Sequence, residues 1–100
     1  MHIGGNWKAL YGAARSGDLE QLDYWLKQDI DLDYQHNEFG TTALIAAAEL
    51  GRRDVCERLV ARGASVDVVS DWDGYTAQQA AQDAGHTALA AWLGAQPRRG

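Results

Sequence analysis

The sequence repeats itself with a period of 34 residues, and this period constrains the fold more than any other feature. The segment Gly40–Leu44 (Gly-Thr-Thr-Ala-Leu) lies 34 residues before Gly74–Gln78 (Gly-Tyr-Thr-Ala-Gln). The same spacing separates Gly17 from Gly51 and Gly51 from Gly85. Because several registers agree on one period, we expect copies of one structural unit stacked in a row, each burying the apolar face of its neighbour.

The middle copy has the pattern of two short helices followed by a loop. Leu44, Ala47 and Ala48 recur at helical spacing. Thr42 precedes them as the expected cap, and Gly51 follows as the expected stop. A second helix should begin at or near residue 54 and end at residue 63, with an apolar face formed by Val55, Cys56, Leu59 and Val60. Residues 64–74 then read as an extended, turn-rich connector.

These residues resemble a known repeat. Gly40–Gly51 (GTTALIAAAELG) resembles the ankyrin motif G-x-T-P-L-H-x-A-A-x-x-G, and Arg62–Asp67 is similar to that family's x-G-A-D-V-N. The resemblance covers residues 7–95 and implies an all-α ankyrin-repeat solenoid of three helix-turn-helix units with projecting, hairpin-like loops (fingers). We expect a single domain over residues 1–100, with units at about 6–39, 40–73 and 74–95 and a flexible tail at 96–100.

The sequence departs from the ankyrin motif in an informative way. Ala43 and Ile45 replace the family's proline and histidine, and the first unit lacks the T-P-L-H segment. The third unit carries polar Gln78 and Gln79 within its motif. Terminal repeats are normally atypical because one face of each meets water. We therefore expect a complete small array of cap, full repeat and cap, with a core that includes Leu10, Leu22, Leu26, Leu44, Val55, Leu59, Val66, Leu89 and Leu93.

Charge and composition narrow the choice of partner. Nine basic and fourteen acidic side chains give a formal net charge of −5. This balance disfavours nucleic acid and anionic membranes and favours a protein partner with a basic surface. A single cysteine excludes an internal disulfide, and neither a secretory signal nor an apolar run long enough to span a bilayer is present in the sequence. We expect a cytoplasmic protein.

No motif for chemistry is present in the sequence. Asp29, Asp31 and Asp33 resemble the opening of a calcium loop, but that loop would need glycine and glutamate where Tyr34 and Gly40 stand. The three histidines have no metal-binding spacing, and the cysteine at position 56 has no basic partner to activate it. We expect no enzyme activity, no catalytic residues, no cofactor and no metal.

The aromatic residues point to a binding surface. Phe39 and Trp72 precede the repeat glycines, at or near the finger tips, and Trp7 and Tyr75 lie where a loop enters a first helix. In ankyrin proteins the fingers and first helices form a concave binding face. Carried over by motif position, that face holds Trp7, Arg15, Glu38, Phe39, Thr41, Glu49, Leu50, Trp72, Asp73, Tyr75 and Asp83. The alternative is that Phe39 and Trp72 fold back and staple neighbouring fingers.

The sequence thus predicts a non-catalytic protein–protein interaction module that uses a concave, acidic and aromatic face. A small array acts by occupying its partner's surface, and masking or neutralising a basic partner is the simplest such act, as an inhibitor, antitoxin or immunity protein does. Two alternatives remain. One is a self-associating scaffold subunit, for example a homodimer. The other is a small-ligand-binding regulator, which would require a closed polar pocket.

Overall fold

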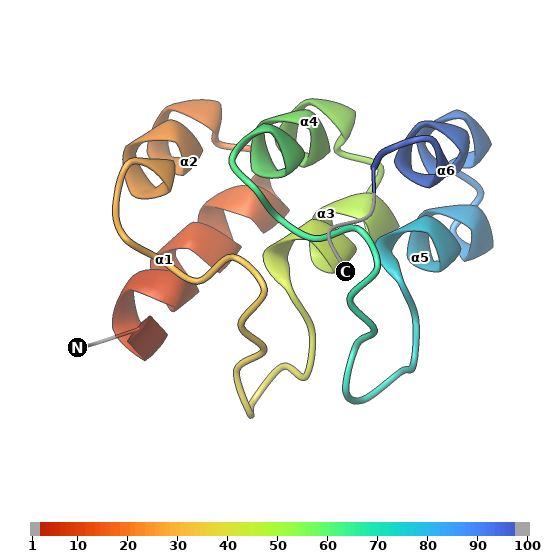
Figure 1. The fold of residues 1–100 in the computed structure, drawn as a ribbon. Coiled ribbons are helices and arrows are strands. Elements are labelled where there is room, and N and C mark those ends of the chain that lie inside the picture. Colours follow the sequence, from red (N-terminus) through yellow and green to blue (C-terminus); the bar gives the residue numbers. More distant parts are fainter. Residues whose placement is uncertain (1–2, 98–100) are drawn as a thin grey trace.

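The protein forms a solenoid of six α-helices in two layers. The computed structural model describes residues 3–97 of the 100-residue chain, and no strand occurs within that range. The helices are α1 (Ile3–Ser16), α2 (Leu19–Leu26), α3 (Ala43–Glu49), α4 (Arg53–Ala61), α5 (Ala77–Asp83) and α6 (Thr87–Gly94). Helices α1, α3 and α5 form an inner layer, and α2, α4 and α6 form an outer layer (Figure 1). The predicted all-α repeat solenoid is confirmed.

Two long loops project from the same side of the stack. The first finger joins α2 to α3, and the second joins α4 to α5 (Figure 1). Within each layer the contacts run between successive units, from α1 to α3, from α3 to α5 and from α2 to α4. The inner helices therefore form a continuous floor beside the fingers. The exact residues at which one unit passes into the next remain a prediction.

Capping side chains explain where α3 and α5 begin, and a glycine explains where α3 ends. The Thr42 hydroxyl accepts a hydrogen bond from the Ile45 backbone nitrogen at 3.2 Å, which confirms the predicted cap of α3. Thr76 caps α5 in the same way, and the Gln79 side chain completes a capping box. Gly51 ends α3 with a positive φ of 73°, a conformation that glycine adopts without strain. Two nested backbone hydrogen bonds close the turn: the Gly51 nitrogen donates to the Ala48 carbonyl oxygen, and the Arg52 nitrogen donates to the Ala47 carbonyl oxygen.

The core runs through all three units. Every residue predicted for it is buried. Alanines supply much of the interface within the inner layer, and residues 46–48 and 80–81 are almost fully enclosed. Small side chains allow the inner helices to approach closely, which accounts for the dense stacking of α3 against α1 and α5. Trp25 and Trp92, on the outer helices, are partly buried and pack against this core.

The two fingers are fastened to each other by hydrogen bonds. The Gln35 side chain donates to the Val69 carbonyl oxygen at 2.9 Å and accepts from the Asp71 backbone nitrogen at 2.8 Å. Nearer the helices, an Asp33 carboxylate oxygen accepts from the Ser65 backbone nitrogen at 2.8 Å. These bonds join positions about one repeat apart. They hold the second finger in a fixed position beside the first, which sets the shape of the surface described next.

Candidate interaction surface

The inner helices and the fingers enclose a shallow hollow on one side of the molecule. We call it the concave hollow, and it draws on all three units. It is lined by Tyr11, Arg15, Phe39, Thr41, Ile45, Ala46, Glu49, Asp73, Tyr75 and Ala80. Residues predicted for the binding face supply six of these positions, namely Arg15, Phe39, Thr41, Glu49, Asp73 and Tyr75. The structure therefore brings together side chains that are up to 60 positions apart in the sequence.

The repeat period also accounts for the lining residues that were not predicted for the binding face. Ile45 lies 34 positions after Tyr11, and Ala80 lies 34 positions after Ala46, so each pair occupies one structural site in successive units. The prediction of the binding face took in aromatic, charged and loop-proximal residues and passed over small or aliphatic ones such as these. Applying the period to every lining position, and not only to aromatic and charged ones, would have identified them from the sequence.

Trp7 does not belong to the exposed surface, contrary to the prediction. Its side chain is 0% exposed and stacks on Tyr11, with ring centroids 4.7 Å apart. Tyr34, His36 and Phe39 surround it at centroid distances of 5.8–5.9 Å. The prediction failed because α1 begins at residue 3 and not at residue 6, which places Trp7 one turn inside the helix. Trp7 is the centre of an aromatic cluster that anchors the first finger.

Phe39 and Trp72 are held in different ways. The Phe39 ring is half-buried, 5.0 Å from the ring centroid of Tyr11, so it packs its finger onto α1 while one edge lines the hollow. Trp72 is 64% exposed. Its backbone nitrogen donates to the Gly40 carbonyl oxygen at 3.3 Å, and its ring lies directly over Gly40, where a methyl group would come within 2.3 Å. Trp72 therefore contacts the first finger and still presents most of its ring to solvent.

The charge on this side of the molecule is uneven. Glu38 pairs with Lys8 at 2.6 Å, and the hydrogen bond and charge of Lys8 lower the pKa of that carboxyl group. By contrast, among residues 6–97 no basic side chain lies within 4.0 Å of the carboxylates of Glu49, Asp73 or Asp83. These three belong to the second and third units, so uncompensated negative charge gathers towards the carboxyl-terminal half of the face.

The nearby carboxylates help to raise the pKa values of two tyrosines. The pKa of Tyr75 is raised, first by the hydrogen bond between its hydroxyl and the Asp83 carboxylate and then by the charge of Asp83. The pKa of Tyr11 is also raised, chiefly by burial, while Arg15 lowers it and Glu49 raises it. The Arg15 guanidinium lies 5.8 Å from the centroid of the Tyr11 ring. Carboxylates, aromatic rings and one guanidinium thus meet at the concave hollow.

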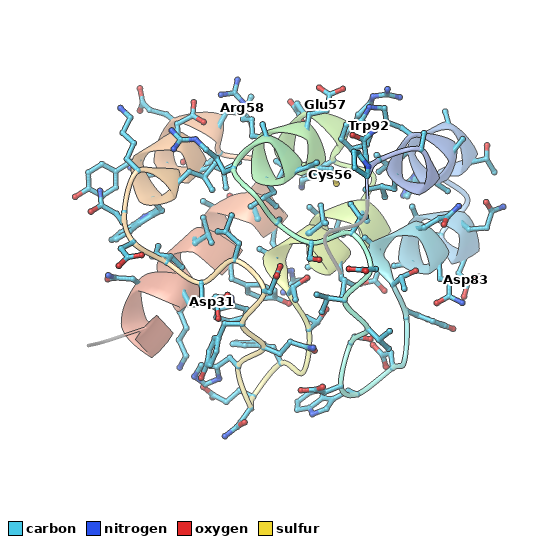
Figure 2. All side chains as sticks on the ribbon, in the orientation of Figure 1. Asp31, Cys56, Glu57, Arg58, Asp83 and Trp92 are labelled. Atoms are coloured by element: carbon cyan, nitrogen blue, oxygen red, sulfur yellow. The ribbon has the colours of Figure 1, made fainter. Side chains whose placement is uncertain are left out.

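Further exposed apolar side chains flank this region. Leu50, the carboxyl-terminal cap residue of α3, is 42% exposed, and Tyr75 is 40% exposed. Val69, on the second finger, is half exposed and was not predicted as a surface contact. The outer layer carries a different set of groups, including Glu57, Arg58 and Trp92, whereas Asp83 extends from the inner layer (Figure 2).

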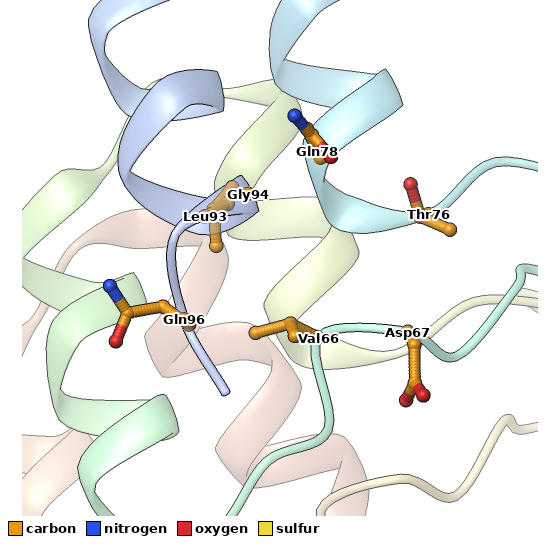
Figure 3. Close-up of a pocket in the computed structure, with 7 residues that line it drawn as sticks. All are labelled: Val66, Asp67, Thr76, Gln78, Leu93, Gly94 and Gln96. Carbon is orange, nitrogen blue, oxygen red and sulfur yellow. The ribbon is translucent and has the colours of Figure 1, made fainter. Parts of the chain in front are cut away.

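A second, smaller hollow lies at the end of the array. Its walls come from the second finger, from the start of α5 and from the end of α6 (Figure 3), with the lining residues Val66, Asp67, Thr76, Gln78, Leu93, Gly94 and Gln96. One unit earlier in the sequence, Leu44 stands where Gln78 stands here. The polar Gln78 makes this end face compatible with water, which suits a terminal repeat. None of the predicted contact residues lines it.

The residues considered for metal binding have structural roles. Asp31 accepts a hydrogen bond from the Asp33 backbone nitrogen at 3.0 Å and thereby forms a turn, and Asp33 bonds the next finger. His36 belongs to the aromatic cluster, and His86 covers Gly51, where a methyl group would approach its ring to 2.6 Å. Within the described part of the chain, no group of three or more metal-binding side chains converges.

Cys56 offers a test of how tightly the central unit is packed. Its side chain is fully buried, and burial raises the pKa of the thiol from 9.0 to about 12. We expect negligible alkylation by iodoacetamide at pH 8 in the folded protein and rapid alkylation after unfolding in guanidinium chloride, because only the thiolate reacts. The raised pKa also links stability to pH, because the thiol of the unfolded protein ionises before the buried thiol does. The stability that the neutral buried thiol contributes is complete below pH 9 and declines as the pH rises towards 12. Rapid labelling of the native protein would contradict the burial of Cys56.

Comparison with known proteins agrees with this arrangement. A two-layered array of short helix pairs with projecting loops defines a class of helical-repeat scaffolds that present an extended concave surface. The family model for ankyrin repeats matches residues 10–98 with three copies. The chain belongs to the ankyrin-repeat family. The resemblance on which the fold prediction rested is therefore confirmed.

Two groups of larger proteins contain similar segments. Diacylglycerol kinase iota of Rattus norvegicus is 41% identical over 91 residues, which cover 89% of this chain and 9% of the kinase. Histone-lysine N-methyltransferase EHMT1 of Mus musculus is 37% identical over 65 residues, which cover 64% of this chain and 5% of the methyltransferase. The chain thus spans less than a tenth of the length of these relatives. No helix in the described range is long and apolar enough to cross a membrane.

Proposed function

We propose that this protein binds another protein with a basic surface through the concave hollow and the exposed finger residue Trp72. Ankyrin repeats are generally protein-interaction modules and are typically non-catalytic. The observation that carries the proposal is the meeting of exposed aromatic rings, Trp72 and Tyr75, with three carboxylates that have no basic neighbour among residues 6–97. Aromatic anchors dominate binding energies, and uncompensated charge steers a partner of opposite sign.

The proposed contact set follows the geometry of the face. It comprises six of the residues that line the hollow and four neighbouring exposed groups. The lining residues are Arg15, Phe39, Thr41, Glu49, Asp73 and Tyr75, and the neighbouring groups are Glu38, Leu50, Trp72 and Asp83. Trp7 is excluded because it is buried. Within this set we expect Trp72 and Tyr75 to contribute most to affinity, since their rings are exposed before binding and can be desolvated on contact. Glu38 should contribute little because Lys8 already neutralises it.

We further propose that the protein acts stoichiometrically. Without catalytic machinery, binding has its effect by covering the partner's basic surface, as an inhibitor, antitoxin or immunity protein does. A lone buried cysteine is compatible with a reducing compartment such as the cytoplasm. The shape of the hollow favours an intermolecular role over binding of a free metabolite, because the hollow is shallow, open to solvent and lined by residues of all three units.

The test is a pull-down from source-cell lysate with the double variant Trp72→Ala/Tyr75→Ala. We expect a specific band with the wild type and at least a tenfold loss of affinity with the variant, the effect of removing about 1.4 kcal/mol or more of binding energy. The matched control is Tyr24→Ala, because the exposed fraction of Tyr24, 54%, lies between those of Tyr75 and Trp72 but Tyr24 lies on the outer helix α2. Phe39 is left intact because its ring supports the aromatic cluster.

Three outcomes separate the alternatives. A band lost with the double variant, kept with Tyr24→Ala and weakened by salt supports the proposal. An identical band with all three proteins would place the binding site elsewhere. No band, combined with a molecular mass that rises with concentration, would instead show that the face binds a second copy of the chain.

A further inference from the structure

We infer that the concave hollow receives an arginine side chain of the partner, with its guanidinium against the aromatic walls and paired with Glu49 and Asp73. This inference rests on the proposed function and specifies the chemistry of its central contact. Of the two hollows described above, only the concave hollow is lined by both aromatic rings and unpaired carboxylates. Neither group alone selects arginine. Together the rings match the planar stacking surface of a guanidinium, and the carboxylates match its positive charge and its hydrogen-bond donors.

The aromatic walls provide the first half of the match. Tyr11 and Phe39 belong to the first unit and its finger, and Tyr75 stands at the entrance to the third unit. A cation over the face of such a ring is attracted by the negative charge density of the π-system. One such cation–π contact exists within the chain itself, because the guanidinium of Arg15 lies 5.8 Å from the ring centroid of Tyr11. The wall therefore accommodates a guanidinium group.

The carboxylates provide the second half. Glu49, at the end of α3, and Asp73, on the second finger, line the hollow and have no cationic neighbour within 4.0 Å among residues 6–97. A guanidinium is planar and has five donors, so it can stack on a ring and donate to carboxylates at the same time. An ammonium group is a strongly hydrated point charge and cannot stack in this way. The combination therefore favours arginine over lysine.

The position of Arg15 adds a specific expectation. It occupies the same site in the first unit as Glu49 does in the second and Asp83 in the third, 34 positions apart in each case. Its positive charge lies at the edge of a hollow that is otherwise negative. Arg15 should therefore compete with an incoming guanidinium for the Tyr11 ring and oppose it electrostatically. Removing this side chain should strengthen the binding of arginine, whereas most substitutions in a binding site weaken it.

The hollow is held in shape before any partner arrives. The bonds of Gln35 to the second finger fix the spacing of the two loops, and the Trp72 ring covers Gly40. The Thr42 and Thr76 caps fix the helix starts that carry the neighbouring side chains. A preorganised site spares the ordering cost that a mobile loop would impose on binding. A single arginine side chain should therefore bind measurably by itself.

The test uses N-acetyl-arginine methylamide as the probe, titrated into the isotopically labelled wild-type protein and followed by NMR. The citrulline analogue is the matched control, because it replaces the charged guanidinium with a neutral urea of nearly the same shape. We expect saturable chemical-shift changes at Tyr11, Glu49 and Tyr75 with the arginine probe, and much smaller changes with citrulline. The lysine analogue should bind more weakly than arginine.

Variants locate the contact. Glu49→Gln and Asp73→Asn should each weaken binding of the arginine probe about two- to fivefold, as expected for one exposed charge pair. Arg15→Ala should strengthen it by a similar factor. Glu57→Gln is the control, since Glu57 lies on the outer helix and pairs with Arg53. The Glu57→Gln protein should bind the arginine probe with the same affinity as the wild type.

The inference and the proposed function can fail separately. Equal shifts with arginine and citrulline, no saturable shifts up to the solubility limit, or tighter binding of lysine would each overturn the arginine pocket. If a protein partner is nevertheless captured and lost with Trp72→Ala/Tyr75→Ala, the proposed function stands without the pocket. If arginine binds as expected but no partner depends on this face, the proposed function fails instead.

Discussion

The substitution Trp7→Ala is expected to lower the free energy of unfolding by about 3–5 kcal/mol, the usual cost of removing a large aromatic side chain from a core. Trp7 is fully buried, and its ring contacts Tyr11, Tyr34 and Phe39. Removing it leaves a cavity beneath the first finger and unpacks that finger from α1. Thermal unfolding followed by circular dichroism should show a melting temperature lower by roughly 10 °C or more in a domain of this size.

Two control variants separate packing from loss of a tryptophan as such. Trp72→Ala removes the exposed tryptophan and should leave the melting temperature nearly unchanged. Trp7→Phe should cost less than Trp7→Ala, because it keeps a ring in the cluster and removes the Nε1 group, which is buried without a hydrogen-bond partner. A Trp7→Ala protein that melts like the wild type would contradict the buried aromatic cluster.

The substitution Leu59→Ala is expected to lower the free energy of unfolding by about 2–5 kcal/mol. Leu59 is fully buried on α4, in the middle unit, where it belongs to the core shared by all three units. A cavity there weakens the packing on both sides, so the whole array should lose stability together. Urea unfolding monitored by tryptophan fluorescence measures the change.

Leu50→Ala is the matched control for Leu59→Ala, because the chemical change is the same and Leu50 is 42% exposed. We expect its stability to stay within about 0.5 kcal/mol of the wild type. Equal losses for the two variants would show that residue 59 is no more enclosed than residue 50, and the assigned face of α4 would then be wrong.

The fold was predictable because the sequence contains three copies of one helix–turn–helix pattern. The glycines at 17, 51 and 85, the alanine-rich inner helices and the apolar faces of the outer helices all follow one period. Each copy alone would be ambiguous, since short apolar runs do not distinguish a helix from a strand. Agreement between copies removes that ambiguity, and the residues predicted for the core are buried as expected.

The surface was predicted less completely, because exposure depends on neighbours that are distant in sequence. Trp7 and Trp72 have the same side chain, yet Trp7 is enclosed by Tyr11 of α1 and by the first finger. Trp72 is exposed, because it lies on the second finger and no third finger stands beside it in the described chain. Glu38 and Glu49 likewise have the same charge, but only Glu38 is paired, with Lys8. Such differences arise from the way units stack and not from local pattern.

Site-specific photo-crosslinking tests most directly which face binds the partner. A photoreactive phenylalanine analogue is placed at position 75, beside the concave hollow, and in a second protein at position 24, on the outer helix α2. Tyrosine occupies both positions in the native chain, and both side chains are exposed. We expect irradiation in source-cell lysate to produce one specific protein adduct from position 75 and none from position 24. An adduct from position 24 alone would place the interaction on the opposite face and contradict the proposed function.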